Sequence, residues 1–383
     1  MPELSSTVDH DAWHGQTPGR RWRLTRWLAP AAAATVIGLL ASGALSADAD
    51  SNLAPQSAAQ LLAAIGNAKV AGFSGTVVEK AALGLPELPA LTGADSATGL
   101  AGLLTGSHTI RLWYGGQTQQ RIALLNSLGE QDVFRNGREL WQWNSDTRTA
   151  SHTVLPSDAP GTAGADRLPV ITPDEAARRA LAMIDPSTAV STDRAAIVAG
   201  RPAYVLVLRP KDDRSRVGSV RISVDGKTKI PLSVQVLARG SDRAAIDISF
   251  TRFSDSMPSE DNFDWTPPAG VRVLQDPPPR HPAGSQPPAY QAPANPARDL
   301  STIGSGWSTI LKVTGVPAQP GSGSENSGTE VGSLLAGLPE VSGSWGSGRL
   351  FSSALLSGLI TSDGRAFVGA VDPELLYAAA AMK

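Results

Sequence analysis

The sequence contains no cysteine among its 383 residues. Disulfide bonds, thiolate metal sites, cysteine catalysis and a lipid-modified cysteine anchor are therefore excluded. Outside the amino-terminal segment the histidines are His108, His152 and His281, which are so far apart in the sequence that we expect no metal site. Lysine plus arginine number 33 and aspartate plus glutamate 35, so the chain has no basic excess for binding nucleic acid.

Motifs that carry catalytic chemistry are also missing. The sequence has no GxSxG nucleophile elbow, no phosphate-binding GxxxxGK loop, no HExxH pair and no dinucleotide-binding GxGxxG turn. The acidic pairs Asp212-Asp213 and Glu260-Asp261 fall in predicted turns, where solvation is the ordinary explanation for charged side chains. We therefore expect no enzyme, no catalytic residue and no cofactor, with a hydrolase as the alternative.

One long apolar run is present, at residues 27–47, and it is about 20 residues long, as a bilayer crossing requires. Four arginines precede it and no basic cluster follows it: Arg20, Arg21, Arg23 and Arg26. The positive-inside rule then predicts a single-pass anchor, with residues 1–26 as a disordered cytoplasmic tail. A cleaved signal peptide is the alternative, because small residues at 44–49 have cleavage spacing. In both cases the rest of the chain is extracytoplasmic.

Residues 52–274 are expected to form one domain of consecutive antiparallel strands. The stretch 198–236 contains three strands with alternating apolar and polar residues, and Asp225-Gly226 supplies one of its turns. Asn136-Gly137 gives a second strong hairpin signal, and segment 263–273 closes the domain.

Two helices interrupt the strands. Residues 55–68 carry apolar side chains at helical spacing, and a second helix begins after Thr172, where Glu175 completes a predicted capping box. About ten or eleven antiparallel strands in one sheet must curl strongly. The predicted fold class is therefore α+β, a half-open antiparallel β-barrel covered by helices.

The chain changes composition after this domain. Residues 275–299 carry eight prolines and are expected to form an extended linker. Residues 300–383 then predict a small α+β module, with a strand over 304–313 and a last helix that begins at Pro373.

An apolar insertion follows the first predicted strand. Residues 81–106 contain many leucines and almost no charge, which is unusual for a loop. We interpret it as a flap against an apolar cavity, and simple filling of the core is the alternative. The candidate flap residues are Leu83, Leu85, Leu88, Leu100, Leu103 and Leu104.

Three tryptophans and one arginine lie near the predicted hairpins that border this flap. Trp113, Trp141 and Trp143 could line a ligand cavity, although aromatic core packing is the alternative. Arg121 could hydrogen-bond carbonyl groups of the flap and hold it closed, whereas most strand arginines point to water.

The order of several motifs resembles a known superfamily. The segments FSGTVVEK, LWYGGQTQQRIALL, DVFRNGRELWQW, TPDEAARRALAMID, VAGRPAYVLVLRP, SVDGKTKIPLSVQV and FDWTPPAGVRV occur in this order within residues 55–274. This region resembles lipoprotein carriers of the LolA type and sigma-factor regulators of the MucB/RseB type, in their actinobacterial form. The resemblance implies an unclosed barrel that holds acyl chains under a helical lid, without catalysis. In the carriers an arginine at a position like Arg121 latches the lid, but here no proline follows it.

Together these features predict an extracytoplasmic carrier or sensor that binds lipid or lipoprotein acyl chains. The alternative is an envelope-stress regulator that binds an anti-sigma factor. The expected partners are therefore acyl chains, the membrane through the amino-terminal helix, and an envelope protein, either an anti-sigma factor or a lipoprotein-handling ABC transporter.

Overall fold

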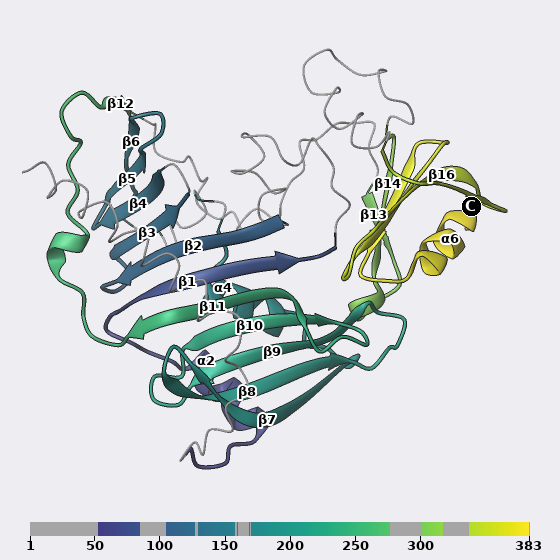
Figure 1. The fold of residues 1–383 in the computed structure, drawn as a ribbon, viewed down its shortest axis with the longest axis horizontal. Helices are drawn as coiled ribbons and strands as arrows, with labels where there is room; N and C mark the ends of the chain where they lie inside the picture. Colours follow the sequence, from purple (N-terminus) through teal and green to yellow (C-terminus); the bar gives the residue numbers. More distant parts are fainter. Residues whose placement is uncertain are drawn as a thin grey trace, which may run out of the picture. The chain divides into compact units, whose positions relative to one another are not determined.

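The computed structural model describes residues 53–84, 105–126, 129–157, 159, 168, 170–275, 300–316 and 337–382. The predicted tail, the apolar run 27–47 and the proline-rich segment 276–299 lie outside these residues. The described part of the chain is mostly β-structure, with two sheets and three α-helices (Figure 1).

The larger sheet has twelve strands in the order β12-β6-β5-β4-β3-β2-β1-β11-β10-β9-β8-β7. Its strands are β1 (Phe73–Ala82), β2 (Thr105–Tyr114), β3 (Gln119–Leu125), β4 (Glu130–Asn136), β5 (Glu139–Asn144), β6 (Thr149–Val154), β7 (Thr188–Val198), β8 (Arg201–Pro210), β9 (Val217–Asp225), β10 (Pro231–Ala238), β11 (Ala244–Ser254) and β12 (Arg272–Gln275). The edge strands β7 and β12 do not pair with each other. The sheet is therefore not closed into a barrel, and the number of strands is close to the prediction.

Most neighbouring strands in this sheet are also neighbours in sequence. Asn136-Gly137 turns β4 into β5 as predicted, and Gly137 has a φ of 60°, which glycine adopts without strain. Two pairings are not local: β1 pairs with β11, and β12 pairs with β6 in parallel. Segment 263–273 thus closes the domain as a strand only from Arg272 onwards, because Pro267 and Pro268 cannot donate ladder hydrogen bonds.

Two short helices pack on this sheet. In α2 (Ala58–Gly66), the Ser57 and Gln60 side chains form a capping box. In α4 (Pro173–Ala182), the Thr172 hydroxyl accepts a hydrogen bond from the Glu175 amide at 3.2 Å. The Glu175 carboxylate binds Arg178 and Arg179 instead, so only half of the predicted capping box forms.

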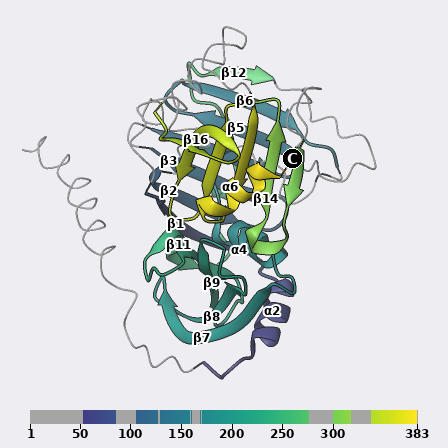
Figure 2. The ribbon, with the colours of Figure 1, turned by 90° about the vertical axis from the view of Figure 1, so that its right-hand side faces the viewer.

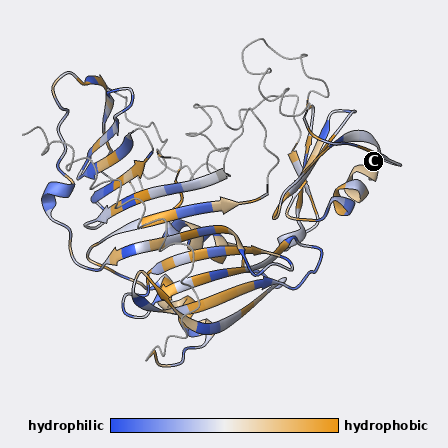
Figure 3. Cartoon of the chain, viewed as in Figure 1, coloured by the Kyte–Doolittle hydropathy of each residue, from blue (hydrophilic) through white to orange (hydrophobic). Residues whose placement is uncertain are grey.

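The helices cover one face of the sheet. Helix α2 contacts β7 and β8, and α4 contacts β10 and β11 (Figure 2). Along many of the strands apolar and polar residues alternate, whereas β8 is apolar throughout Val205–Leu208 (Figure 3). Alternate residues such as Leu206, Ile222 and Val234 therefore pack with Leu61 of α2 and Ala177 of α4 in one apolar cluster. We call this the helix-covered face.

A smaller sheet has six strands in the order β13-β14-β18-β17-β16-β15. Its elements are β13 (Leu300–Ile303), β14 (Ile310–Thr314), β15 (Glu340–Gly343), β16 (Gly346–Ser352), β17 (Ser357–Thr361), β18 (Arg365–Gly369) and the helix α6 (Pro373–Ala381). The single strand predicted over 304–313 is interrupted by a short 3-10 helix at Gly306–Ser308. Helix α6 begins at Pro373 as predicted, and it packs on one face of this sheet through Leu376 and Ala380.

Backbone and side-chain hydrogen bonds join the smaller sheet to the larger one. The Arg216 amide donates to the Ala370 carbonyl at 2.8 Å, and the Ala354 amide donates to the Leu83 carbonyl at 2.7 Å. The buried Trp307 donates from its indole nitrogen to the Thr188 hydroxyl at 2.8 Å. Residues 300–382 therefore make specific contacts with the domain that contains the larger sheet, in addition to being connected to it along the chain.

Candidate functional site

The candidate site is the helix-covered face of the larger sheet. Its apolar residues form two clusters, one under the helices and one over β1 to β5. Fully buried members of the two clusters include Leu61, Val77, Ile110, Leu206, Leu208, Ile222 and Val224. In the described part of the chain, α2 and α4 cover part of this face, so movement of either helix would uncover apolar residues of the sheet.

Helix α4 meets this face through small side chains and through Leu181, which packs partly buried against the apolar cluster, as does Ile184 just after the helix. Its buried residues are Pro173, Ala177 and Ala180. Because a methyl group buries little apolar area, each of these alanines stabilises the closed position of the helix only slightly, at about 0.8 kcal/mol per buried carbon. The fully buried residues of α4 thus contribute little apolar area, and Leu181 supplies the larger side chain of this contact.

The recess beside α2 is small. Its volume is about 270 Å³, and its lining includes Leu53, Leu61, Thr192, Tyr204 and Val205. Ligand pockets usually have volumes of roughly 300–1,000 Å³. A lipid chain would therefore fit on the helix-covered face only after α2 or α4 has moved.

One acidic side chain lies on this apolar face. Glu79 pairs with His108 across β1 and β2, is 3% exposed, and its Oε2 atom has no hydrogen-bond partner. Burial raises the pKa of Glu79, and the nearby His108 and the Ile171 amide offset this only partly. A buried carboxyl group with a raised pKa can remain protonated near neutral pH and donate a hydrogen bond. Pattern analysis of the sequence did not select Glu79, although an acid within the apolar strand FSGTVVEK is a visible signal.

The predicted flap residues are mostly outside the described part of the chain. This applies to Leu85, Leu88, Leu100, Leu103 and Leu104. Leu83 is described and is 3% exposed, and it packs in the apolar cluster under the helices together with Leu355 of the smaller sheet.

The predicted aromatic and arginine residues lie together, but on the opposite face. Strand register places Trp113, Arg121, Phe134 and Trp141 in one row across β2 to β5. The next residue, Ile122, belongs to the core of the helix-covered face. Because side chains alternate along a strand, Arg121 must point away from that face.

Arg121 is bound within this row. Its guanidinium group pairs with Asp132 at 2.8 Å and lies over the rings of Trp113, at 4.7 Å, and Phe134, at 4.6 Å. Burial raises the pKa of Asp132, and the ion pair with Arg121 offsets only part of this effect. In this conformation Arg121 links β2, β3 and β4 on the face opposite the helix-covered face.

A fourth tryptophan, which the strand pattern did not single out, covers this row. The Trp265 ring lies 5.4 Å from Phe134, 5.3 Å from Trp141 and 5.8 Å from Trp143, measured between ring centroids. Trp265 stands in the segment before β12, so its position depends on the non-local pairing of β12 with β6.

Within the described ranges, no group of histidine, aspartate and glutamate side chains has the arrangement of a metal site. No helix in the same ranges is both long and apolar enough to span a bilayer, and the segment 27–47 lies outside them.

No protein-family model and no curated protein sequence matches this chain. Among solved structures, the complex of MucA and MucB from Pseudomonas aeruginosa is 17% identical, with a TM-score of 0.41 over 84% of this chain and 96% of the other. A second MucB structure is 16% identical, with a TM-score of 0.37 over 84% of this chain and 94% of the other. A LolA superfamily protein from Nitrosomonas europaea is 10% identical, with a TM-score of 0.21 over 55% of this chain and 99% of the other.

Proposed function

We propose that this protein is a non-catalytic, extracytoplasmic binding protein that holds lipid or lipoprotein acyl chains on its helix-covered face. Residues 27–47 would tether it to the membrane. The observation that carries this proposal is an extended apolar sheet face on which, within the described residues, two short helices pack, one of them mainly through small side chains.

Binding would proceed by movement of a lid. When α4 leaves the sheet, apolar residues such as Val234 and Ala245 become available to an acyl chain. Each buried methylene of the guest then contributes about 0.8 kcal/mol. The buried carboxyl group of Glu79, whose Oε2 atom has no hydrogen-bond partner, would supply one polar contact to the guest.

Locking α4 to the sheet should abolish lipid binding. Cα atoms of α4 and β10 approach within 8 Å, and the chain has no native cysteine, so a disulfide engineered between these two elements would be the only one in the protein. We expect the chain from Ala49 onwards to carry added lipid in native mass spectrometry. The variant with Ala180→Cys and Val234→Cys should lose this lipid when oxidised and regain it when reduced.

The two single-cysteine variants are the matched controls, and both should bind lipid with or without reductant. Equal lipid binding by the oxidised and reduced double variant would exclude α4 as the lid. A lipid-free mass for the unmodified chain, with no change on adding lipid, would refute the proposed function itself.

A second candidate function is a regulator that binds an envelope protein, such as an anti-sigma factor. The smaller sheet favours it, because the face away from α6 exposes apolar residues: Leu300 is 62% exposed, Val368 43% and Leu311 37%. Leu311 and Val368 pair across β14 and β18, so they form a continuous patch. Exposed apolar patches of this kind often bind proteins.

Polar substitution of this patch separates the two functions. The variant Leu311→Ser with Val368→Ser should lose binding to the extracytoplasmic part of an anti-sigma factor in calorimetry, while its lipid binding stays unchanged. Leu356→Ser is the control, because Leu356 is 36% exposed but lies in the turn before β17. Unchanged binding of the anti-sigma segment by the double variant would exclude this surface as the contact.

A further inference from the structure

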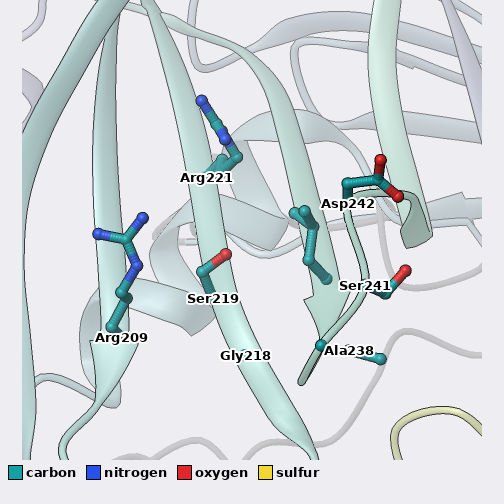
Figure 4. A pocket seen from close by; sticks show the side chains of 9 residues that line it. Arg209, Gly218, Ser219, Arg221, Ala238, Ser241 and Asp242 are labelled. Atoms are coloured by element: carbon teal, nitrogen blue, oxygen red, sulfur yellow. The ribbon is translucent and has the colours of Figure 1, made fainter.

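A second pocket lies on the face of the larger sheet that the helices do not cover. It crosses β8, β9 and β10 and reaches the turn after β10 (Figure 4). Its volume is about 450 Å³, within the range of about 300–1,000 Å³ usual for small-molecule sites. The pocket is lined by Arg209, Gly218, Ser219, Arg221, Leu237, Ala238, Gly240, Ser241 and Asp242.

Strand alternation explains why polar groups gather here. Leu208, Val220 and Val236 pack in the apolar cluster on the helix-covered face. The adjacent residues Arg209 and Ser219 therefore point to the opposite side. Ser219 is 8% exposed, so its hydroxyl group forms part of the pocket floor.

Most charged groups on this side of the sheet have partners. Arg221 binds Asp193 at 2.6 Å, and Gln235 donates to Asp247 at 3.0 Å. Arg209 and Asp242 are different, because neither side chain makes a hydrogen bond or an ion pair with any of the residues that the structure describes. Figure 4 shows these two side chains at opposite sides of the pocket, with Ser219 and Arg221 between them.

The surrounding segment is basic, although the whole chain is not. Residues 201–255 contain eleven lysines and arginines and six aspartates and glutamates, a net charge of +5, whereas the whole chain has a net charge of −2. This local excess attracts anions to the strands that carry the pocket. Asp242 nevertheless puts a negative charge on one wall, which a purely anionic ligand would have to approach.

A ligand that carries both a negative and a positive charge would match both the arginines and the Asp242 carboxylate. We propose that the pocket binds a zwitterionic group, in which a phosphate and a primary ammonium stand a few bonds apart. Arg209 and Arg221 hold the phosphate by charge-assisted hydrogen bonds, and the Ser219 hydroxyl donates to the same group. Asp242 accepts hydrogen bonds from the ammonium.

The lining also selects the kind of ammonium. Quaternary ammonium groups are usually bound by aromatic side chains, and the pocket has none. A carboxylate instead needs N–H donors, which a primary ammonium has and a trimethylated one lacks. The shared chemistry is therefore that of phosphoethanolamine, as a lipid headgroup or as a free small molecule. Because this pocket and the helix-covered face lie on opposite sides of the sheet, the two proposals can fail separately.

Calorimetric titration of the full-length chain tests the proposal. Glycerophosphoethanolamine, a phosphodiester, represents the lipid headgroup, and O-phosphoethanolamine, a phosphomonoester, represents the free molecule. We expect the chain to bind at least one of them, and the tighter of the two identifies the source. Phosphocholine should bind at least tenfold more weakly than O-phosphoethanolamine.

Two exposed residues provide variants that do not disturb the core. Arg209→Gln should weaken binding of phosphoethanolamine at least tenfold. Asp242→Asn should weaken it to the level of phosphocholine, while leaving phosphocholine binding unchanged. Matched controls are Arg252→Gln and Asp261→Asn, which alter an exposed arginine and an exposed aspartate outside the pocket.

The proposal is overturned if neither ligand binds up to its solubility limit, or if the control variants weaken binding as much as the pocket variants do. It is also overturned if the choline analogue of the ethanolamine ligand that binds, phosphocholine or glycerophosphocholine, binds as tightly as that ligand, since Asp242 would then not contact the ammonium.

Discussion

Replacing Arg121 by alanine is expected to lower the free energy of unfolding by about 3 kcal/mol at neutral pH. The substitution leaves the Asp132 carboxylate, whose side chain is 0% exposed, without its counter-charge at 2.8 Å. It also removes the cation–π contacts with Trp113 and Phe134. Urea unfolding can be followed by tryptophan fluorescence, because Trp113, Trp141 and Trp265 lie on this face.

The pH dependence of this loss has a definite sign. Burial already raises the pKa of Asp132, and without Arg121 the pKa rises further. The difference between the two proteins is therefore largest where the wild-type carboxyl group is ionised, and it shrinks as the pH falls and both proteins bind the proton. An alternative role for Arg121 as a latch of the lid predicts little loss of stability but faster exchange of lipid.

The double variant Arg121→Ala with Asp132→Asn is the control, because it removes both charges. It should recover a large part of the lost stability. Arg252→Ala, at an exposed arginine, should change the free energy of unfolding by less than about 0.5 kcal/mol. If Arg121→Ala is as mild as Arg252→Ala, the ion pair with Asp132 does not stabilise this face.

Replacing Asp225 by alanine is expected to cost about 4 kcal/mol of stability. Asp225 is 1% exposed and its two oxygens bind Arg201 at 2.7 and 2.9 Å. It also accepts hydrogen bonds at 2.7 Å from the amide and the hydroxyl of Thr228, so it fixes the turn between β9 and β10. Asp225→Ala leaves all of these donors without their acceptor.

Lowering the pH should remove the stabilisation that the Asp225 carboxylate provides. Burial by itself raises the pKa of Asp225, but the bonds from Arg201 and Thr228 outweigh it and hold the pKa below its usual range. A depressed pKa stabilises the folded protein above the unfolded-state value of about 4, and this stabilisation is lost as the pH falls through the folded-state pKa. In Asp225→Asn the free energy of unfolding, measured with urea, should therefore fall less between neutral and acidic pH than it does in the unmodified protein.

The matched control is Asp193→Asn. Asp193 binds Arg221 at 2.6 Å, but both side chains are more than one-third exposed, at 37% and 35%. Exposed pairs contribute about 0–1 kcal/mol, so the change should be small. A loss at Asp193 equal to that at Asp225 would show that burial does not distinguish the two ion pairs.

Local signals in the sequence predicted most of the elements. Asn136-Gly137 predicted a hairpin turn with a positive φ at Gly137, and this is confirmed. Asp225-Gly226 also marks a turn between neighbouring strands, but the positive φ expected at this pair falls on Lys229 instead. Thr172 and Pro173 predicted the start of α4, since capping involves neighbouring backbone groups.

The sequence also predicted which side chains share a face of a strand, but it did not predict which side chains on other strands they contact. Alternation alone separates Arg121 from Ile122, yet nothing near Arg121 in the sequence indicates that its carboxylate partner is Asp132 on the next strand. The pKa of Glu79 likewise depends on the tertiary structure, because burial raises it and the amide of Ile171, about 90 positions away, offsets part of this effect. These properties arise only once distant segments are in contact.

The sequence by itself determined which residues form strands, helices and turns, because these follow from dihedral preferences and from the period of apolar residues along the chain. Only the tertiary structure decided that β1 pairs with β11, that Trp265 covers the row containing Arg121, and that Arg209 and Asp242 face one pocket. The physical reason is that strand pairing joins residues separated by well over a hundred positions. The free energy of such contacts depends on register and burial, which no local pattern encodes.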